Sequence, residues 1–270
     1  MKPLLEIRDI SLSYHTIEGE TPALSHISFQ LMPGEFLAVV GPSGCGKSTL
    51  LNLICGLTEP EEGQILMNGT SPAPGDSRIG YMLQKDHLLE WRSIYQNVML
   101  GLEIRGEKTA DKLTCVEEML HTYGLGKFRN ARPSQLSGGM RQRAALIRTL
   151  ALKPELLLLD EPFSALDYQT RLNVSDDIGR ILKEEHKPAI LVTHDISEAI
   201  SMADRVIVLT RRPASVARIV PICFSIENRT PFNSRSAPEF KNYFNLIWKE
   251  LQSYDADFSC PKKISPKDPT

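Results

Sequence analysis

The sequence predicts an α/β protein that is built on a parallel β-sheet and carries a helical insertion. Three short, almost wholly apolar runs are typical of buried parallel strands: EFLAVVG at 35–41, LLLLD at 156–160 and AILVTH at 189–194. Helical patterns alternate with these runs, and that order favours a parallel sheet with crossover helices. From about residue 88 to 155 the pattern is helical with little strand signal, which predicts that this segment is inserted into the α/β core.

The first third of the chain is rich in predicted strands. Residues 4–14 and 23–31 alternate apolar and polar side chains, as half-buried strands do. Helical spacing follows at 48–57, and it stops near Gly56. The remaining strands of this region are predicted at 64–70 and 78–83.

The later part of the chain is mainly helical between its buried strands. Beyond Arg211 the pattern weakens, and residues 211–224 indicate a hairpin. The last residues, 260–270, are rich in Pro and Lys, so we expect them to be disordered. We therefore expect a main domain over 1–225, with its helical subdomain at about 88–155, and a short extension over 226–270. Further helices are predicted at 109–125, after Ser137, at 167–187, at 196–205 and at 237–251.

Composition excludes several classes of protein. A net charge of -2 provides no basic field for nucleic acid, so we expect no nucleic-acid partner. No apolar run approaches the ~18 residues that cross a bilayer, and the first residues lack the apolar stretch of a secretory signal. The five cysteines are an odd number and form no CxxC motif, which predicts reduced thiols and no zinc site.

The segment GPSGCGKST at 41–49 matches the phosphate-binding pattern G-x-x-x-x-G-K-[ST]. It follows a predicted strand and opens a helix, which is the context that this pattern requires. Glycine lets backbone N–H groups converge on phosphate oxygens, Lys47 supplies a cation, and the Ser48 hydroxyl is a candidate Mg²⁺ ligand. Cys45 lies near the helix start, where thiolates are favoured, but we expect it to have no role beyond fitting into the loop. The alternative is that alkylation of Cys45 blocks nucleotide binding and that ATP protects it. The predicted ATP-binding residues of this motif are Gly41, Pro42, Ser43, Gly44, Cys45, Gly46, Lys47, Ser48 and Thr49.

Two carboxylates end the strand at 156–160. Asp160 at the carboxyl end of a strand is placed to face a Mg²⁺ ion, and Glu161 is placed to accept a proton from an attacking water. A second helix start, LSGGM at 136–140, offers a serine hydroxyl and glycine N–H groups at the positive end of a helix dipole.

Three further features complete the series: Gln84 after a predicted strand, SALD at 164–167 and VTHD at 192–195. In their order and spacing, all these motifs together resemble the ATP-binding subunit of ABC transporters. The resemblance covers about residues 4–220. It implies a P-loop NTPase (RecA-like) core with an antiparallel β subdomain and an inserted α-helical subdomain. It also implies ATP and Mg²⁺ as cofactors, with Ser48, Gln84 and Asp160 as metal ligands. Lys47, Glu161 and His194 are then the catalytic residues, and Tyr14 stacks on adenine.

The resemblance further implies a head-to-tail dimer. Ser137, Gly138, Gly139 and Asp167 then contact the ATP that is bound to a second copy of the chain. Met140 departs from the usual LSGGQ, and because Ser137 and both glycines are retained we expect the γ-phosphate contacts to be retained as well.

The segment at 84–106 and LTRRP at 209–213 resemble the nitrate/sulfonate/taurine importer group. This implies an importer ATPase on the cytoplasmic side of the cell membrane, with an integral membrane permease and, indirectly, a solute-binding protein as partners. The alternatives are an exporter ATPase and a non-transport ABC ATPase. Trp91 either faces the permease or fills the core of the helical subdomain. For the helix around Trp248, packing on its own domain is favoured over bracing a dimer.

Overall fold

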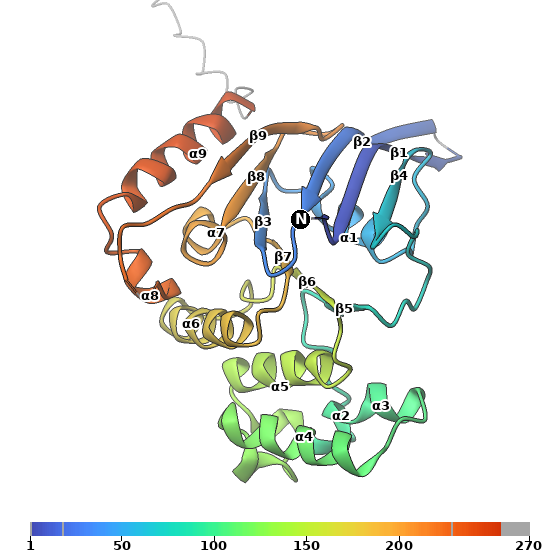
Figure 1. Cartoon of the computed structure of the whole chain (residues 1–270), viewed down its shortest axis with the longest axis vertical. Helices are drawn as coiled ribbons and strands as arrows, with labels where there is room; N and C mark the ends of the chain where they lie inside the picture. The colour runs from blue at the N-terminus through green and yellow to red at the C-terminus, as the bar shows by residue number, and fades with distance from the viewer. Residues whose placement is uncertain (1, 18, 228, 255–270) are drawn as a thin grey trace, which may run out of the picture.

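The computed structural model describes residues 2–17, 19–227 and 229–254, which form two β-sheets and a separate group of helices (Figure 1). The strands are β1 (Leu5–Thr16), β2 (Gly19–Leu31), β3 (Phe36–Val40), β4 (Glu62–Met67), β5 (Ile79–Met82), β6 (Leu156–Asp160), β7 (Ala189–Val192), β8 (Arg205–Leu209) and β9 (Val216–Pro221). The helices are α1 (Lys47–Ile54), α2 (Ile94–Val98), α3 (Leu100–Ile104), α4 (Ala110–Thr122), α5 (Gly138–Leu150), α6 (Tyr168–Glu184), α7 (Ile196–Met202), α8 (Pro231–Ser234) and α9 (Phe240–Tyr254).

The larger sheet has the strand order β5-β6-β7-β3-β8-β9. Its first five strands pair in parallel, and β9 pairs with β8 in the antiparallel sense. Both faces are buried, as the continuous apolar runs predict: Leu158 of β6 packs in the cluster that contains α1, whereas Leu157 and Leu159 pack in the cluster that contains α6 and α7. The carboxyl ends of β3, β6 and β7 therefore meet at one edge of the sheet.

The smaller sheet, β2-β1-β4, is antiparallel. Alternating apolar residues of β1, such as Ile7, Ile10 and Leu12, are buried in the same cluster as Leu50 and Leu51 of α1. This sheet therefore lies over α1 at one side of the larger sheet (Figure 1).

Helices α2 to α5 form a body with its own core, which projects from the α/β body (Figure 1). Helix α5 belongs to both bodies, because Ala144 and Ile147 pack in the helical core whereas Ala145 and Leu146 pack against the larger sheet. The parallel core, the antiparallel sheet and the inserted helices confirm the predicted fold class.

The predicted hairpin at 211–224 is wrong in its first arm. The hairpin consists of β8 and β9 and turns between Leu209 and Val216. The strand pattern of β8 was not recognised, because it begins three residues after the end of α7 and is as short as five residues. The sequence patterns also did not predict α8, a four-residue turn that begins at Pro231.

Helix α9 packs on the α/β body through Ile247, which is fully buried in the same cluster as β8. Trp248 stacks on Phe244, with ring centroids 6.2 Å apart, and remains about half exposed. Trp91 is 72% exposed, so the alternative in which it fills the helical core is wrong. The expected disordered tail at 260–270 lies outside the described residues.

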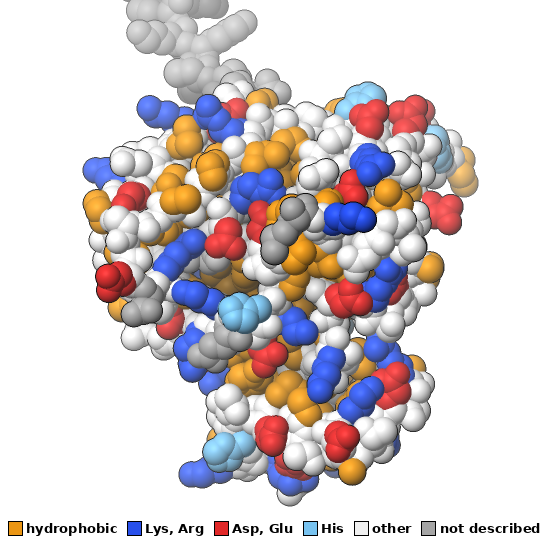
Figure 2. All heavy atoms as spheres, in the orientation of Figure 1, with side chains coloured by type: hydrophobic (Ala, Val, Ile, Leu, Met, Phe, Trp, Pro, Cys, Tyr) orange, Lys and Arg blue, Asp and Glu red, His pale blue; other side chains and the backbone are white. Residues whose placement is uncertain are grey.

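Charged side chains of both signs are interspersed over the face shown in Figure 2. Among the described residues, no helix is long and apolar enough to span a bilayer.

Candidate active site

The loop between β3 and α1 is held in a conformation that requires glycine. Gly44 and Gly46 have φ angles of 73° and 122°, which side-chain-bearing residues rarely adopt. A Cβ on Gly46 would lie 2.9 Å from Leu24 Cδ2, so the loop also packs closely against β2. No side chain caps the start of α1, where Gly46 is the N-cap residue. The positive end of this helix therefore faces the loop.

Lys47 is 6% exposed and bends back into the loop. Its Nζ donates to the carbonyl oxygens of Gly41 and Pro42, at 3.0 Å in each case. Both acceptors are neutral, and no carboxylate of the described residues lies within hydrogen-bond distance of Lys47 Nζ. A cavity of about 350 Å³ opens beside this lysine, and the residues that line it are Ser43, Gly44, Gly46, Lys47, Ser48, Thr49, Gln84, Asp160, Glu161 and Arg212.

Asp160 ends β6 at the same edge of the sheet and is 6% exposed. Ser48 Oγ donates to its Oδ1 at 3.1 Å, and the Tyr81 hydroxyl donates to its Oδ2 at 3.4 Å. Burial raises the pKa of Asp160 above its usual value, the Ser48 hydrogen bond opposes this, and the charge of Glu161 raises it further. Two adjacent carboxylates in a buried position are thus costly without a cation.

Glu161 directly follows β6 and has a φ angle of 44°, a strained conformation for a residue with a side chain. Its backbone N–H donates to Val192 O of β7 at 2.8 Å, which fixes this conformation. Gln84 Nε2 donates to Glu161 Oε2 at 3.2 Å, and His194 Nδ1 lies 3.1 Å from the same oxygen. The structure therefore brings Gln84, Glu161 and His194 together from three different strand ends.

The predicted metal ligands fit a Mg²⁺ ion. Ser48 and Asp160 are already in contact, and Gln84 lines the same cavity. No group of three or more His, Cys, Asp or Glu residues is gathered for a metal in the described part of the chain. This donor set of one hydroxyl, one carboxylate and one amide is typical of Mg²⁺, which usually keeps waters and takes further ligands from substrate phosphates.

Tyr14 lies near the start of α1. Its hydroxyl shares a 2.9 Å hydrogen bond with Thr49 Oγ1, and its side chain is partly exposed. The hydrogen bond holds the ring at the rim of the phosphate-binding loop, and the exposed surface of the ring leaves it accessible to a flat ligand.

The residues at 137–139 lie apart from this cavity and close to Asp167 instead. Ser137 is exposed and accepts a long, 3.4 Å hydrogen bond from Met140 N, as the N-cap of α5. A Cβ on Gly138 would lie 3.0 Å from Leu166 Cδ2, so α5 begins against the segment that carries Asp167. Asp167 is itself exposed and caps α6 through Thr170 N. The four residues predicted to contact a second nucleotide thus form a cluster of their own.

Cys45 is packed inside the phosphate-binding loop. The thiol is 2% exposed, and burial raises its pKa, although Lys47 acts in the opposite direction. Desolvation therefore disfavours the thiolate, which supports the expectation that Cys45 only fits into the loop; the alkylation alternative stays a prediction. A Cβ on Gly41 would lie 2.9 Å from Cys45 Sγ, so the thiol is packed inside the loop.

Arg212 lines the cavity around Lys47 and was not among the predicted site residues. With Arg211 it also lines an adjoining cavity of about 530 Å³ next to Pro42 and Ser43. The motif LTRRP contains both arginines, but the chain separates them from the phosphate loop by more than 160 residues. Only the pairing of β8 with β3 places the end of β8 beside that loop.

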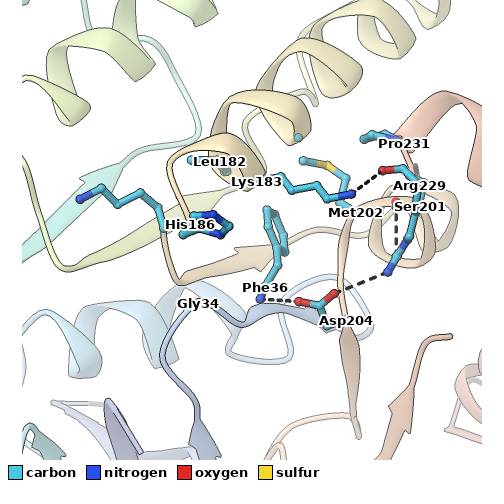
Figure 3. A pocket seen from close by; sticks show the side chains of 12 residues that line it. Gly34, Phe36, Leu182, Lys183, His186, Ser201, Met202, Asp204, Arg229 and Pro231 are labelled. Atoms are coloured by element: carbon cyan, nitrogen blue, oxygen red, sulfur yellow. Dashed lines mark hydrogen bonds and ion pairs between the residues drawn. The ribbon is translucent and has the colours of Figure 1, made fainter. Parts of the chain in front are cut away.

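A second hollow, of about 280 Å³, lies at the opposite edge of the sheet, where β3 and β8 begin (Figure 3). Its polar groups bind one another: Lys183 Nζ donates to Arg229 O at 3.2 Å, and Phe36 N donates to Asp204 Oδ2 at 2.9 Å. Ligands of parallel α/β sheets bind at the carboxyl ends of the strands. The cavity around Lys47 is therefore the candidate active site.

The sequence model of the family described as ABC transporter matches residues 24–164. The ABC transporter ATP-binding protein YtlC of Bacillus subtilis is 45% identical over 251 residues, which are 93% of this chain and 96% of that protein. The nitrate transport protein NasD of Klebsiella oxytoca is 39% identical over 219 residues, which are 80% of this chain and 83% of that protein.

A solved structure is similar along most of this chain. It is the dimeric structure of a post-hydrolysis state of the ATP-binding cassette MJ0796 bound to ADP and Pi. That chain is 30% identical and superposes with a TM-score of 0.70, over 81% of this chain and 99% of its own length.

Proposed function

The chain belongs to the ABC transporter family and is an ATPase, and from this premise we propose that it powers an importer of a small anionic or polar solute. The observation that carries the proposal is the buried Lys47 beside the Asp160–Glu161 pair, at the edge of the sheet where the phosphate-binding loop begins α1. This arrangement places a cation, a helix start and a candidate base around one cavity.

The proposed chemistry assigns a separate task to each group. The loop at 41–46 and Lys47 bind the phosphates and stabilise the charge that develops on them. Glu161 accepts a proton from the attacking water, and His194 orients that water against the γ-phosphate. Gln84 and His194 both contact Glu161, so the three side chains are held at one place beside the cavity.

Ser48, Asp160 and Gln84 are the proposed Mg²⁺ ligands. A Mg²⁺ ion held by these three residues would supply positive charge beside the two carboxylates. The raised pKa of Asp160 supports this assignment, because a buried carboxylate beside a second one is stabilised by a cation.

Two copies of the chain are proposed to close over two ATP molecules. Ser137, Gly138, Gly139 and Asp167 lie together but outside the cavity around Lys47, so they are free to complete a partner's site. The exposed Ser137 and its long cap hydrogen bond support this role, since the hydroxyl loses little when it turns to a phosphate oxygen.

The chain is proposed to work at the cytoplasmic side of the cell membrane, on an integral membrane permease that receives solute from a solute-binding protein. The exposed Trp91 on the helical body supports a role in permease contact. Nitrate is the solute in the name of one relative, and a sulfonate, taurine, bicarbonate or pyrimidine-type precursor fits the same importer group. The ATPase itself does not touch the solute, so its residues do not select among these candidates.

The alternatives are the ATPase of an exporter and a non-transport ABC ATPase. A non-transport protein of that kind usually has two cassettes or a long coiled-coil insertion. In the described helical body, the longest helices, α4 and α5, have 13 residues each, which supports a transporter subunit. Import is distinguished from export by co-purification with the permease, followed by ATPase assays with solute-loaded binding protein. Stimulation of ATP turnover by a loaded binding protein is the result expected for an importer.

The dimer is tested with Glu161→Gln. This change removes the base and keeps the shape, so we expect ATP and Mg²⁺ to bind, hydrolysis to stop, and a stable dimer to form in size-exclusion chromatography with light scattering. Ser137→Ala in the Glu161→Gln protein should weaken that dimer about tenfold or more, because each removed hydroxyl deletes a charge-assisted contact to phosphate.

Ser253→Ala is the matched control, because Ser253 is exposed on α9 and its Oγ donates only within that helix, to the Glu250 carbonyl. A Glu161→Gln protein that stays monomeric with ATP and Mg²⁺ would contradict the proposed dimer.

A further inference from the structure

Arg171 of α6 contacts two segments: the residues just before its own helix, and the segment at 195–198 that begins α7. Its Nη2 donates to the backbone carbonyl of Leu166 at 3.0 Å. Its Nη1 lies 3.6 Å from Asp195 Oδ2, and its Nε lies 3.7 Å from Glu198 Oε1. The guanidinium is planar and rigid, so the three contacts are made by one body and do not vary independently.

Two of these contacts reach the segment that carries His194. Asp195 follows His194 directly, and its Oδ1 accepts from Ser197 N and Glu198 N, which fixes the start of α7. Glu198 Oε2 accepts from Thr193 Oγ1 at 2.7 Å, and the same Thr193 oxygen accepts from Asp195 N at 3.0 Å. The backbone on both sides of His194 is thus held by the two carboxylates that face Arg171.

Glu198 depends on a nearby cation. Its side chain is 3% exposed. Burial raises the pKa of Glu198 to about 7; the hydrogen bond from Thr193 lowers this pKa, and the charge of Asp195 raises it. Arg171 and His194 lower this pKa. These are the charged groups that act on Glu198, and Arg171 forms the ion pair with it.

The third contact reaches the other cluster of proposed site residues. Leu166 immediately precedes Asp167. Its side chain packs against the start of α5, because a Cβ added to Gly138 would lie 3.0 Å from Leu166 Cδ2. A displacement of this segment by a partner's nucleotide would therefore move the carbonyl that Arg171 binds.

We propose that Arg171 is a positioning residue that couples the placement of Asp167, which faces a partner's nucleotide, to the placement of His194, which faces the chain's own nucleotide. The inference rests on the proposed function. It adds a physical connection between the cluster that contains Asp167 and the residues around His194. It predicts that removal of this guanidinium slows hydrolysis while ATP still binds.

The test compares Arg171→Ala and Arg171→Lys with Arg180→Ala. Arg180 lies on the same helix and pairs with Asp177 at the surface, so its removal controls for the loss of an arginine from α6. For Arg171→Ala we expect kcat to fall about tenfold or more while the Kd for ATP changes less than about threefold, because only the hydrolytic groups are displaced. Arg180→Ala should leave both values near those of the unmodified protein.

The pH profile separates positioning from simple support of the fold. Loss of the Arg171 charge raises the pKa of Glu198 further, so the acidic limb of kcat should move to higher pH by about half a unit or more. Arg171→Lys keeps the positive charge, so the acidic limb of kcat should return to its original pH. Lysine lacks the planar guanidinium that makes three contacts, so kcat itself should be restored only in part. In a Glu198→Gln protein, Arg171→Ala should no longer move the limb.

The inference is overturned if Arg171→Ala keeps its kcat, or if kcat falls with an unmoved acidic limb and in proportion to a lower thermal midpoint. ATP-driven dimerisation of Glu161→Gln is measured in parallel. If that dimer forms while Arg171→Ala is without effect, only the coupling fails; if the dimer does not form, the proposed function fails.

Discussion

Two helix starts in this protein have similar sequences and different surroundings. At α1, Gly46 offers no side-chain cap, a buried Lys47 is folded into the loop, and two carboxylates lie across a cavity of about 350 Å³. At α5, Ser137 caps the helix itself and lies outside that cavity. A helix start therefore becomes a binding site only when the fold places suitable groups opposite it. The start of α1 faces such groups within the same chain, whereas the start of α5 directs its hydrogen-bond donors toward solvent.

Lys47→Ala removes the buried cation at the start of α1, and we expect it to have the largest effect of the substitutions considered. Without the buried cation, the loop loses its charge on the phosphates, and we expect ATP affinity to fall about a hundredfold or more. Equilibrium binding of a fluorescent ATP analogue measures the loss. Lys127→Ala, at an exposed lysine, is the control. Retention of full affinity by Lys47→Ala would place the nucleotide elsewhere.

Gly139→Ala probes why α5 begins with two glycines. A Cβ at Gly139 would lie 2.8 Å from Val174 Cγ2 and 2.9 Å from Thr170 Cγ2 of α6, and both are stiff β-branched side chains. We expect a loss of about 1–3 kcal/mol in the free energy of unfolding, which urea denaturation measures. Gly138→Ala meets only the flexible end of Leu166 and should cost less. Equal losses for the two changes would contradict the packing argument for Gly139.

Met140→Gln is expected to have the smallest effect. Met140 packs against the helical core and is only partly buried, and Ser137 and both glycines are unchanged by the substitution. ATPase activity should therefore change by less than about tenfold, which corresponds to about 1.4 kcal/mol in the barrier. A larger loss in the steady-state rate, with unchanged thermal stability, would show that the fifth side chain of LSGGM acts in the site.

Much of the fold could be predicted from local patterns, because buried parallel strands are continuous apolar runs. Leu156–Asp160 and Phe36–Val40 are fully buried throughout, and both were predicted as buried strands. The first arm of the hairpin was missed where the strand β8 begins three residues after the end of α7, since four apolar residues after an arginine do not by themselves distinguish a strand from a continued helix.

The phosphate-binding loop, the paired carboxylates and the order of motifs could be predicted without a structure, because each depends on residues that are adjacent in the chain. Which of these groups meet depends on the fold. Strand pairing brings Gln84, Glu161 and His194 together and carries Arg212 to the phosphate loop. Packing between α5 and α6 gathers Gly138 and Leu166, and Arg171 joins that cluster to the residues beside His194. Such contacts join residues tens of positions apart, so local pattern carries no information about them and the packed core fixes them.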